Sequence, residues 1–194
     1  MSTRQPSSPN KVSPEEVNAL RSRMTSVDLG PGEMHATETP TLISTVLGSC
    51  VSVCLYSPAR KIGAMCHCVL PTQPRSLGRR YGPNCCVDTC VGNMIEAMTR
   101  QHKVPFATIR AKLFGGAEVL QTGAAQAGET ATIGKRNIAA ARQALREYAL
   151  PLVAECVGGA QGYRILFNTE TGEVLLRRAQ NSRIDEHDLA TEFR

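Results

Sequence analysis

The chain contains no tryptophan, and only 4% of its 194 residues are aromatic. An aromatic core is therefore excluded, but a hydrophobic content of 42% is enough for an aliphatic one. The excess of positive over negative charge is also small, because the net charge is +5 and 20% of the residues are charged. Nucleic-acid-binding domains cluster basic side chains densely on one face. This composition gives no strong case for that class, and we expect no nucleic-acid partner.

Long apolar runs are missing as well. A membrane-spanning helix needs about 18 or more consecutive apolar residues, and no such run occurs. The first ten residues, which are rich in Ser, Pro and Asn, lack the apolar segment of a signal peptide. We therefore expect a cytoplasmic protein with no direct membrane insertion.

Cysteine is plentiful by contrast, at eight residues. An exported disulfide scaffold would be short and would carry a signal peptide, so we interpret the thiols as reduced. Cys66-His67-Cys68 resembles a metal-ligand cluster, but alternation along a strand directs His67 away from both cysteines. As an alternative, the Cys-x-Cys pair of Cys66 and Cys68 could bind zinc together with Cys54 or Cys85, although the sequence has no Cys-x-x-Cys pair. We favour the interpretation that these cysteines are small buried hydrophobic residues, and we expect no metal and no cofactor.

Composition divides the chain into three parts. Residues 1–32 are polar and are expected to form a flexible N-terminal extension, in which Val17, Leu20 and Met24 favour one short helix. Residues 33–178 form the compact domain, and residues 179–194 form a polar C-terminal tail. The sequence shows no repeat and no second domain.

The compact part alternates strand and helix patterns. Runs rich in β-branched residues predict strands at 41–47, 51–56, 62–70, 108–114 and 152–157, and a hairpin of 163–167 with 173–177. We expect the first three to form a β-meander. Apolar residues at helical spacing predict helices at about 87–98 and 134–150. Because the helices fall between strands, the fold class is a mixed α/β domain with helices packed on a sheet.

Cys50 differs from the other thiols because it closes a Gly-Ser-Cys corner after the first predicted strand of the meander. Gly48 permits a backbone turn closed to other residues, so the amides of Ser49 and Cys50 can point at one spot. Such a pair of donors suits a developing oxyanion. An imidazole beside the thiol, from His67, would lower its pKa and act as the base. The alternative is that both residues are structural.

A third polar residue is expected to orient His67. Either Ser44 or Thr45 can hydrogen-bond the far ring nitrogen and fix the tautomer. Counting side-chain parity back from Cys50 places Ser44 on the same face and Thr45 on the other. We therefore favour Ser44.

Ordered motifs extend from about residue 35 to residue 178. The longest are Leu47-Gly48-Ser49-Cys50 continuing to residue 56, Lys61-Ile62-Gly63-Ala64-Met65-Cys66-His67, Lys112-Leu113-Phe114-Gly115-Gly116-Ala117, and Ile133-Gly134-Lys135-Arg136-Asn137-Ile138. Shorter matches lie at 70–71, 80–81, 154–155, 158–159, 162 and 171–172. In this order and spacing the sequence resembles the CheD family of chemoreceptor glutamine deamidases.

The resemblance implies an activity and a fold. Members hydrolyse the side-chain amide of selected glutamines in methyl-accepting chemotaxis receptors, giving glutamate and ammonia in support of chemotaxis signalling. It also implies a layered α/β/β fold similar to the catalytic domain of the cytotoxic necrotizing factor deamidases. By position, Cys50 matches the nucleophile, His67 the base, and Ser44 a third polar residue that is commonly Thr in the family.

The resemblance also implies partners. A CheC-type phosphatase is one, and the alternative function is a binding module that docks to this phosphatase and stimulates it with little or no deamidation. Arg75, Arg79 and Arg80 follow the His67 strand in a polar loop. We expect them to contact acidic side chains on receptor helices, and the alternative is a solvated loop.

Overall fold

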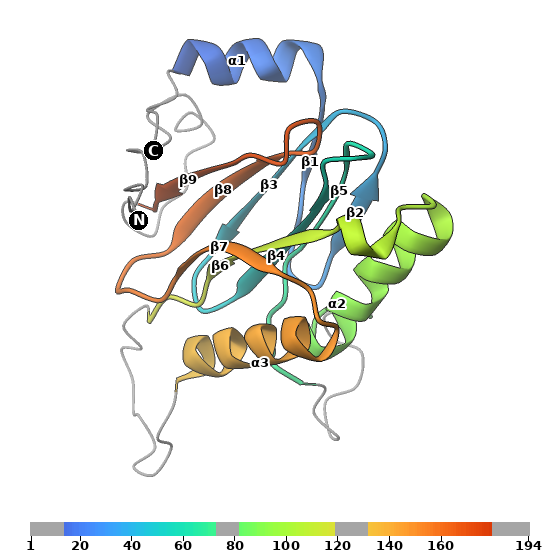
Figure 1. The fold of residues 1–194 in the computed structure, drawn as a ribbon. Coiled ribbons are helices and arrows are strands. Elements are labelled where there is room, and N and C mark those ends of the chain that lie inside the picture. The colour runs from blue at the N-terminus through green and yellow to red at the C-terminus, as the bar shows by residue number, and fades with distance from the viewer. Residues whose placement is uncertain (1–13, 73–81, 119–131, 180–194) are drawn as a thin grey trace, which may run out of the picture.

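The computed structural model describes residues 14–72, 82–118 and 132–179, and within these ranges its strands form two sheets (Figure 1). The strands are β1 (Thr25–Asp28), β2 (Met34–Thr37), β3 (Thr41–Leu47), β4 (Val51–Ser57), β5 (Ile62–Cys66), β6 (Arg110–Gly115), β7 (Leu152–Val157), β8 (Tyr163–Asn168) and β9 (Val174–Arg178). One sheet has the order β1-β3-β8-β9, and the other has the order β2-β5-β4-β6-β7.

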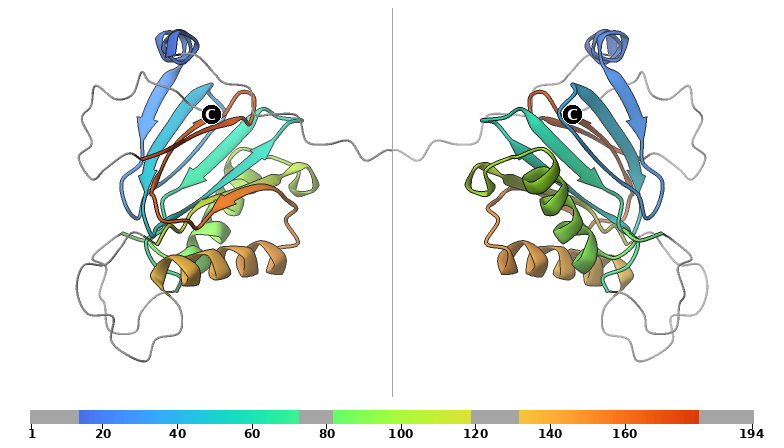
Figure 2. Two further views of the ribbon diagram at one scale, coloured as in Figure 1. Left: turned by 90° about the vertical axis from the view of Figure 1, so that its left-hand side faces the viewer. Right: turned by 90° about the vertical axis from the view of Figure 1, so that its right-hand side faces the viewer.

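The sheets and helices form layers. Helices α2 (Val87–Glu96) and α3 (Ile133–Glu147) cover one face of the five-stranded sheet, and the four-stranded sheet covers its other face (Figures 1 and 2). Helix α1 (Pro14–Arg23) packs on the outer side of the four-stranded sheet. A π-helical turn (Ala97–Gln101) continues α2, and a short 3₁₀ turn (Phe106–Thr108) precedes β6. The predicted α/β class, with two main helices on a layered β structure, is confirmed.

Strand alternation sorts the core into two sides. On β4, Val51, Val53 and Leu55 face α2 and α3, where they meet Val91 and Met94. Between the sheets, a second cluster combines residues of both. Its members include Ile43 and Leu47 from β3, Met65 from β5, and Ile165 and Phe167 from β8. The cluster under the helices is aliphatic, as the composition predicts, whereas the inter-sheet cluster also contains Phe114, Tyr163 and Phe167.

The predicted meander is wrong at its first strand. β4 pairs with β5 as expected, but β3 pairs with β1 and β8 in the other sheet. The corner from Gly48 to Cys50 carries the chain from one sheet to the other. Two buried strands that face each other across a sandwich have the same apolar pattern as two paired neighbours. The sequence pattern therefore could not distinguish these arrangements.

The ordered fold also begins before residue 33, where the domain boundary was expected. β1 pairs in parallel with β3, and Val17 and Met24 pack against Leu42. β1 is short and mostly exposed, so it lacks the apolar alternation that marks a strand. At the other end, only Ala179 of the expected tail belongs to the described residues, and its amide donates to the carbonyl of Gly162. None of the described helices is long and apolar enough to cross a membrane.

Candidate active site

The corner between β3 and β4 is held by its carbonyl groups. The carbonyl of Gly48 accepts from the amide of Ala117 at 2.8 Å, and that of Cys50 accepts from the amide of Gly116 at 2.7 Å. The carbonyl of Ser49 accepts from the side-chain amide of Asn137 at 2.9 Å. The amides of Ser49 and Cys50 donate to no backbone carbonyl within residues 14–72, 82–118 and 132–179. The expected role of these two amides as donors to an oxyanion stays a prediction.

Two glycines after β6 allow this close approach. Gly115 has φ 98°, and a Cβ atom there would lie 2.4 Å from the carbonyl oxygen of Cys50. Gly116 has φ 70° and stands directly against the backbone of Gly134 in α3. The sequence motif around these glycines is therefore a packing device for the corner, because no side chain fits between the two backbones.

Cys50 and His67 share one face of the five-stranded sheet. Val51 and Cys68 exchange both backbone hydrogen bonds, at 3.0 and 2.8 Å, and both side chains belong to the core under the helices. Their sequence neighbours Cys50 and His67 consequently face the other sheet, where Cys50 packs on the inter-sheet core. In this register they are diagonal neighbours, whose Cα atoms are typically about 7–8 Å apart.

The ring of His67 is fixed through Nδ1. The Thr45 hydroxyl donates to the carbonyl of Leu29 at 2.7 Å, and Nδ1 lies 2.8 Å from the same hydroxyl oxygen and 3.5 Å from that carbonyl. Since a carbonyl only accepts and the hydroxyl proton is already used, Nδ1 carries the proton and donates to Thr45. The neutral imidazole then has its lone pair on Nε2, the nitrogen needed by a general base.

Ser44 does not orient His67, contrary to our expectation. Its hydroxyl donates to the carboxylate of Asp28 on β1, while the neighbouring Thr45 contacts the imidazole. Parity counted from Cys50 fails because Gly48 and Cys50 lie at the passage between sheets, where strand alternation is interrupted. Within β3 alone, Ile43 and Leu47 face the other sheet, and Thr45 has their parity. Counting from these apolar neighbours would have found it.

Burial controls the protonation of both reactive groups. Burial raises the pKa of the Cys50 thiol, and a hydrogen bond with its own amide lowers it in part. The sequence had suggested a thiol pKa lowered by the imidazole. Burial lowers the pKa of His67, while the Leu29 carbonyl and the charges of Cys66 and Glu33 raise it in part. Both shifts favour a neutral thiol beside a neutral imidazole.

Asn137 is a residue of the candidate site for which no role was predicted from the sequence. It is fully buried on α3, and its side-chain amide donates to Ser49 at 2.9 Å and to the carbonyl of Val69 at 3.0 Å. Asn137 therefore links the corner from Gly48 to Cys50 with the chain that follows His67. The sequence feature that could have indicated this role is a polar residue on the buried face of an amphipathic helix. The loop arginines Arg75, Arg79 and Arg80 lie outside the described residues.

The chain is similar to known proteins over most of its length. The family model described as "CheD chemotactic sensory transduction" matches residues 69–178. The "Probable chemoreceptor glutamine deamidase CheD 2" of Geobacter sulfurreducens is 37% identical over 87% of this chain and 99% of its own. The "Probable chemoreceptor glutamine deamidase CheD 3" of Dechloromonas aromatica is 38% identical over 86% and 95%.

A third relative and a solved structure complete the comparison. The "Chemoreceptor glutamine deamidase CheD" of Thermotoga maritima is 33% identical over 77% of this chain and 90% of its own. The hypothetical protein YfiH of Bacillus licheniformis has a TM-score of 0.45 at 13% identity, over 72% of this chain and 68% of that one. The similarity to the first two relatives extends over nearly the whole length of each, and the family model matches more than half of this chain. This chain therefore belongs to the CheD family.

Proposed function

We propose that this chain is a cysteine hydrolase that deamidates glutamine side chains of methyl-accepting chemotaxis receptors. The observation that carries the proposal is the common face of Cys50 and His67, with Nδ1 of His67 committed to Thr45. Receptor glutamine as the substrate is supported by the names of the relatives, which are chemoreceptor glutamine deamidases. Selected glutamines of the receptor would become glutamates.

The first half of the reaction forms a thioester. Nε2 of His67 takes the proton of Cys50 as the sulfur attacks the carbonyl carbon of the glutamine side chain. The amides of Ser49 and Cys50 donate to the oxygen, which becomes negative in the tetrahedral intermediate. His67 then passes the proton to the amide nitrogen, the carbon–nitrogen bond breaks, and ammonia leaves.

The second half regenerates the thiol. Water attacks the thioester carbon while Nε2 of His67 accepts one of its protons. The carbon–sulfur bond breaks, glutamate is released, and the proton returns from His67 to the sulfur of Cys50. Each step uses groups of this chain and one water molecule, and the net reaction is amide plus water to carboxylate and ammonium.

Ammonia release from a purified receptor cytoplasmic domain tests the proposal. We expect Cys50→Ala to abolish release and His67→Ala to leave almost none, because general acid–base catalysis contributes about 10²–10⁴-fold. Cys156→Ala, which removes a partly buried thiol on β7, is the matched control and should retain wild-type release. Turnover by Cys50→Ala at the wild-type rate would exclude this thiol as the nucleophile.

The same variants separate catalysis from a purely binding role. In that alternative the chain docks to a CheC-type phosphatase and stimulates it, with little or no deamidation. Wild type and Cys50→Ala would then release equally little ammonia and would stimulate the phosphatase equally. We expect instead a large difference in ammonia release, with the CheC-type phosphatase as a further partner whose stimulation does not require the thiol.

A further inference from the structure

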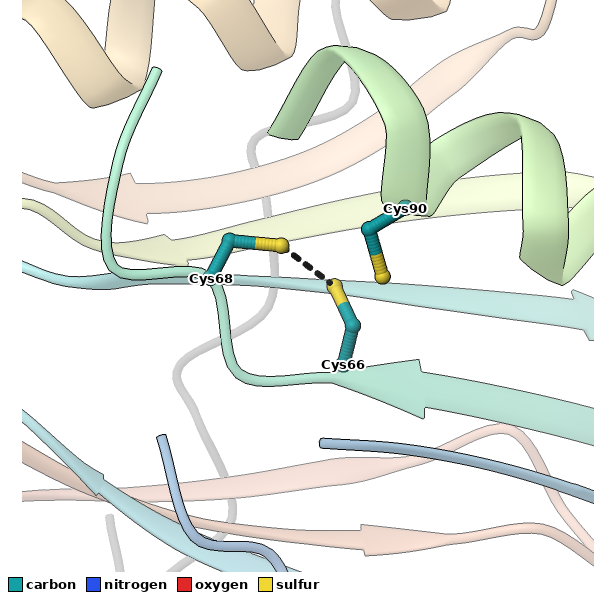
Figure 3. Close-up of side chains that lie close together, drawn as sticks. All are labelled: Cys66, Cys68 and Cys90. Carbon is teal, nitrogen blue, oxygen red and sulfur yellow. Dashed lines mark hydrogen bonds between the residues drawn. The ribbon is translucent and has the colours of Figure 1, made fainter. Parts of the chain in front are cut away.

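Three cysteine side chains that catalysis does not use meet under helix α2. Cys66 ends β5, Cys68 follows two residues later, and Cys90 points toward them from α2 (Figure 3). Their sulfur atoms all lie within 4.8 Å of one another, and the sulfurs of Cys66 and Cys68 are 3.5 Å apart. All three side chains are fully buried.

This spacing is close to that of three thiolates around one ion. Metal–sulfur bonds of about 2.3 Å put ligand sulfurs roughly 3.8 to 4.0 Å apart in tetrahedral or trigonal geometry. Small side-chain rotations would therefore bring all three to a common centre. His67 faces away from the two flanking cysteines, as strand alternation predicts. The third thiol, which α2 brings to the face shared by Cys66 and Cys68, was not predicted from the sequence.

The sulfur of Cys66 is hydrogen-bonded on several sides, and its thiol donates to the carbonyl of Val53 at 3.7 Å. The amide of Val53 donates to its sulfur at 3.4 Å, and the thiol of Cys68 donates to it as well. These bonds hold the Cys66 sulfur in place beside the other two thiols.

We propose that Cys66, Cys68 and Cys90 bind one soft cation with a filled d shell, Zn²⁺ or Cu⁺, through their thiolates. Thiolate ligands select these ions over Mg²⁺ or Ca²⁺, which prefer oxygen. Binding forms three metal–sulfur bonds and releases the remaining thiol protons to solvent.

Two further thiols distinguish the candidate ions. The sulfurs of Cys85 and Cys86 lie 3.1 Å apart, and Cys86 precedes the first turn of α2, where its carbonyl accepts from the amide of Cys90. Cys85 is only partly buried, so it offers a way in from the surface. Zn²⁺ requires a fourth ligand, whereas Cu⁺ is satisfied by three sulfurs. Cys85 and Cys86 lie outside the group of sulfurs within 4.8 Å, so one of them would have to move inward to complete a Zn²⁺ site.

Metal titration of the reduced, metal-free protein under anaerobic conditions tests the proposal. One arm uses Co²⁺, which reports thiolate ligation of a Zn²⁺ site by its charge-transfer absorption, and the other uses Cu⁺ with a chromophoric competitor. We expect one equivalent to bind in at least one arm. Cys90→Ser should weaken binding by roughly 100-fold or more, beyond the 10–100-fold loss typical of changes outside the ligand shell. A Cys85→Ser/Cys86→Ser variant should weaken Co²⁺ binding only.

Cys156→Ser is the matched control, because it removes a thiol on β7 outside the cluster. It should bind as the wild type does. Stoichiometric binding that survives in Cys90→Ser, or the absence of binding in both arms, would overturn the site. Should Cys90→Ser unfold, Cys90→Ala preserves the small apolar volume, and X-ray absorption of the wild-type complex counts sulfur ligands independently.

Discussion

At the scale of single residues, one hydroxyl group decides what His67 can do. Thr45 donates to the carbonyl of Leu29 and accepts from Nδ1 of His67, so its single proton fixes which ring nitrogen is protonated. The neighbouring Ser44 has the same functional group but binds Asp28 instead. The adjacent hydroxyls of Ser44 and Thr45 thus make different contacts, and substituting each one in turn distinguishes their effects.

We predict that Thr45→Val lowers kcat for receptor deamidation by about 5–150-fold, which corresponds to the roughly 1–3 kcal/mol cost of leaving a buried polar group unpaired. Thr45→Ser restores the hydroxyl and should recover most of the activity. Ser44→Ala is the matched control and should stay near wild type, with a small loss of thermal stability from the Asp28 contact. A severe loss in Ser44→Ala with an unaffected Thr45→Val would reverse this assignment.

The protonation of Cys50 gives a second prediction. Because burial raises the pKa of this thiol, the thiolate is a minor species near neutral pH. We expect iodoacetamide modification of Cys50, followed by peptide mass spectrometry, to accelerate continuously as the pH rises from neutral through 9 (roughly the thiol range). A rate that is already at its plateau near neutral pH would indicate a preformed thiolate–imidazolium pair and contradict the neutral pair described above.

At the scale of elements, the sequence predicted most strands and helices and the local pairs β4–β5 and β8–β9, but not the partners of β3. Strand 41–47 and the two main helices were recognised because their apolar periods are strong. Alternation on the strand before residue 67 correctly placed His67 opposite Cys66 and Cys68, because one strand keeps its own parity. Parity failed between Thr45 and Cys50, where the chain changes sheets. The thiol cluster was missed because it depends on how α2 docks.

The docking of β6 against the corner predicts a contrast between two glycines. Gly115 and Gly158 both have positive φ, of 98° and 76°, so alanine at either position costs about 1–2 kcal/mol of backbone strain. A Cβ atom at Gly115 would also strike the Cys50 carbonyl, whereas one at Gly158 would meet nothing within 4 Å. We expect Gly115→Ala to lose about 100-fold in kcat, as displaced catalytic groups do.

Gly158→Ala is the control, since it carries the same kind of strain beside the same strand. It should lose thermal stability to a small degree and retain wild-type kcat. Equal kcat in the two variants, measured by ammonia release, would show that the Gly115 contact does not position the thiol.

Helix α3 makes a comparable contribution through Asn137. Asn137→Leu keeps the side-chain size but leaves the carbonyls of Ser49 and Val69 without their donor. Each unpaired buried group costs about 1–3 kcal/mol, so we predict that the free energy of unfolding falls by roughly 2–5 kcal/mol and that kcat falls with it. Gln143→Leu, an exposed change on the same helix, should leave denaturant unfolding and kcat nearly unchanged. Full stability in Asn137→Leu would show that the tie is dispensable.

At the scale of the whole molecule, the N-terminal segment belongs to the sheet that holds the ring of His67. β1 forms the edge of the four-stranded sheet, and Leu29, directly after it, supplies the carbonyl that both Thr45 and His67 contact. Helix α1 has a different task, because Val17 packs on the outer face of this sheet. The segment that composition marks as an extension therefore has one part that packs on the outer face and one part that contacts Thr45 and His67.

Two truncations distinguish these parts. Removing residues 1–24 deletes Val17 and Met24 from the outer cluster and exposes Leu42, and each lost buried side chain costs about 1.5–3 kcal/mol. We predict a lower melting temperature with kcat retained below it. Removing residues 1–32 also deletes β1 and Leu29, so the Thr45 hydroxyl is released from its fixed acceptor and His67 loses its defined tautomer. We expect ammonia release to disappear in this variant at temperatures where the shorter truncation remains active. If instead both truncated proteins deamidate the receptor at the same rate, the Leu29 carbonyl does not hold the base, and catalysis depends on residues 33–178 alone.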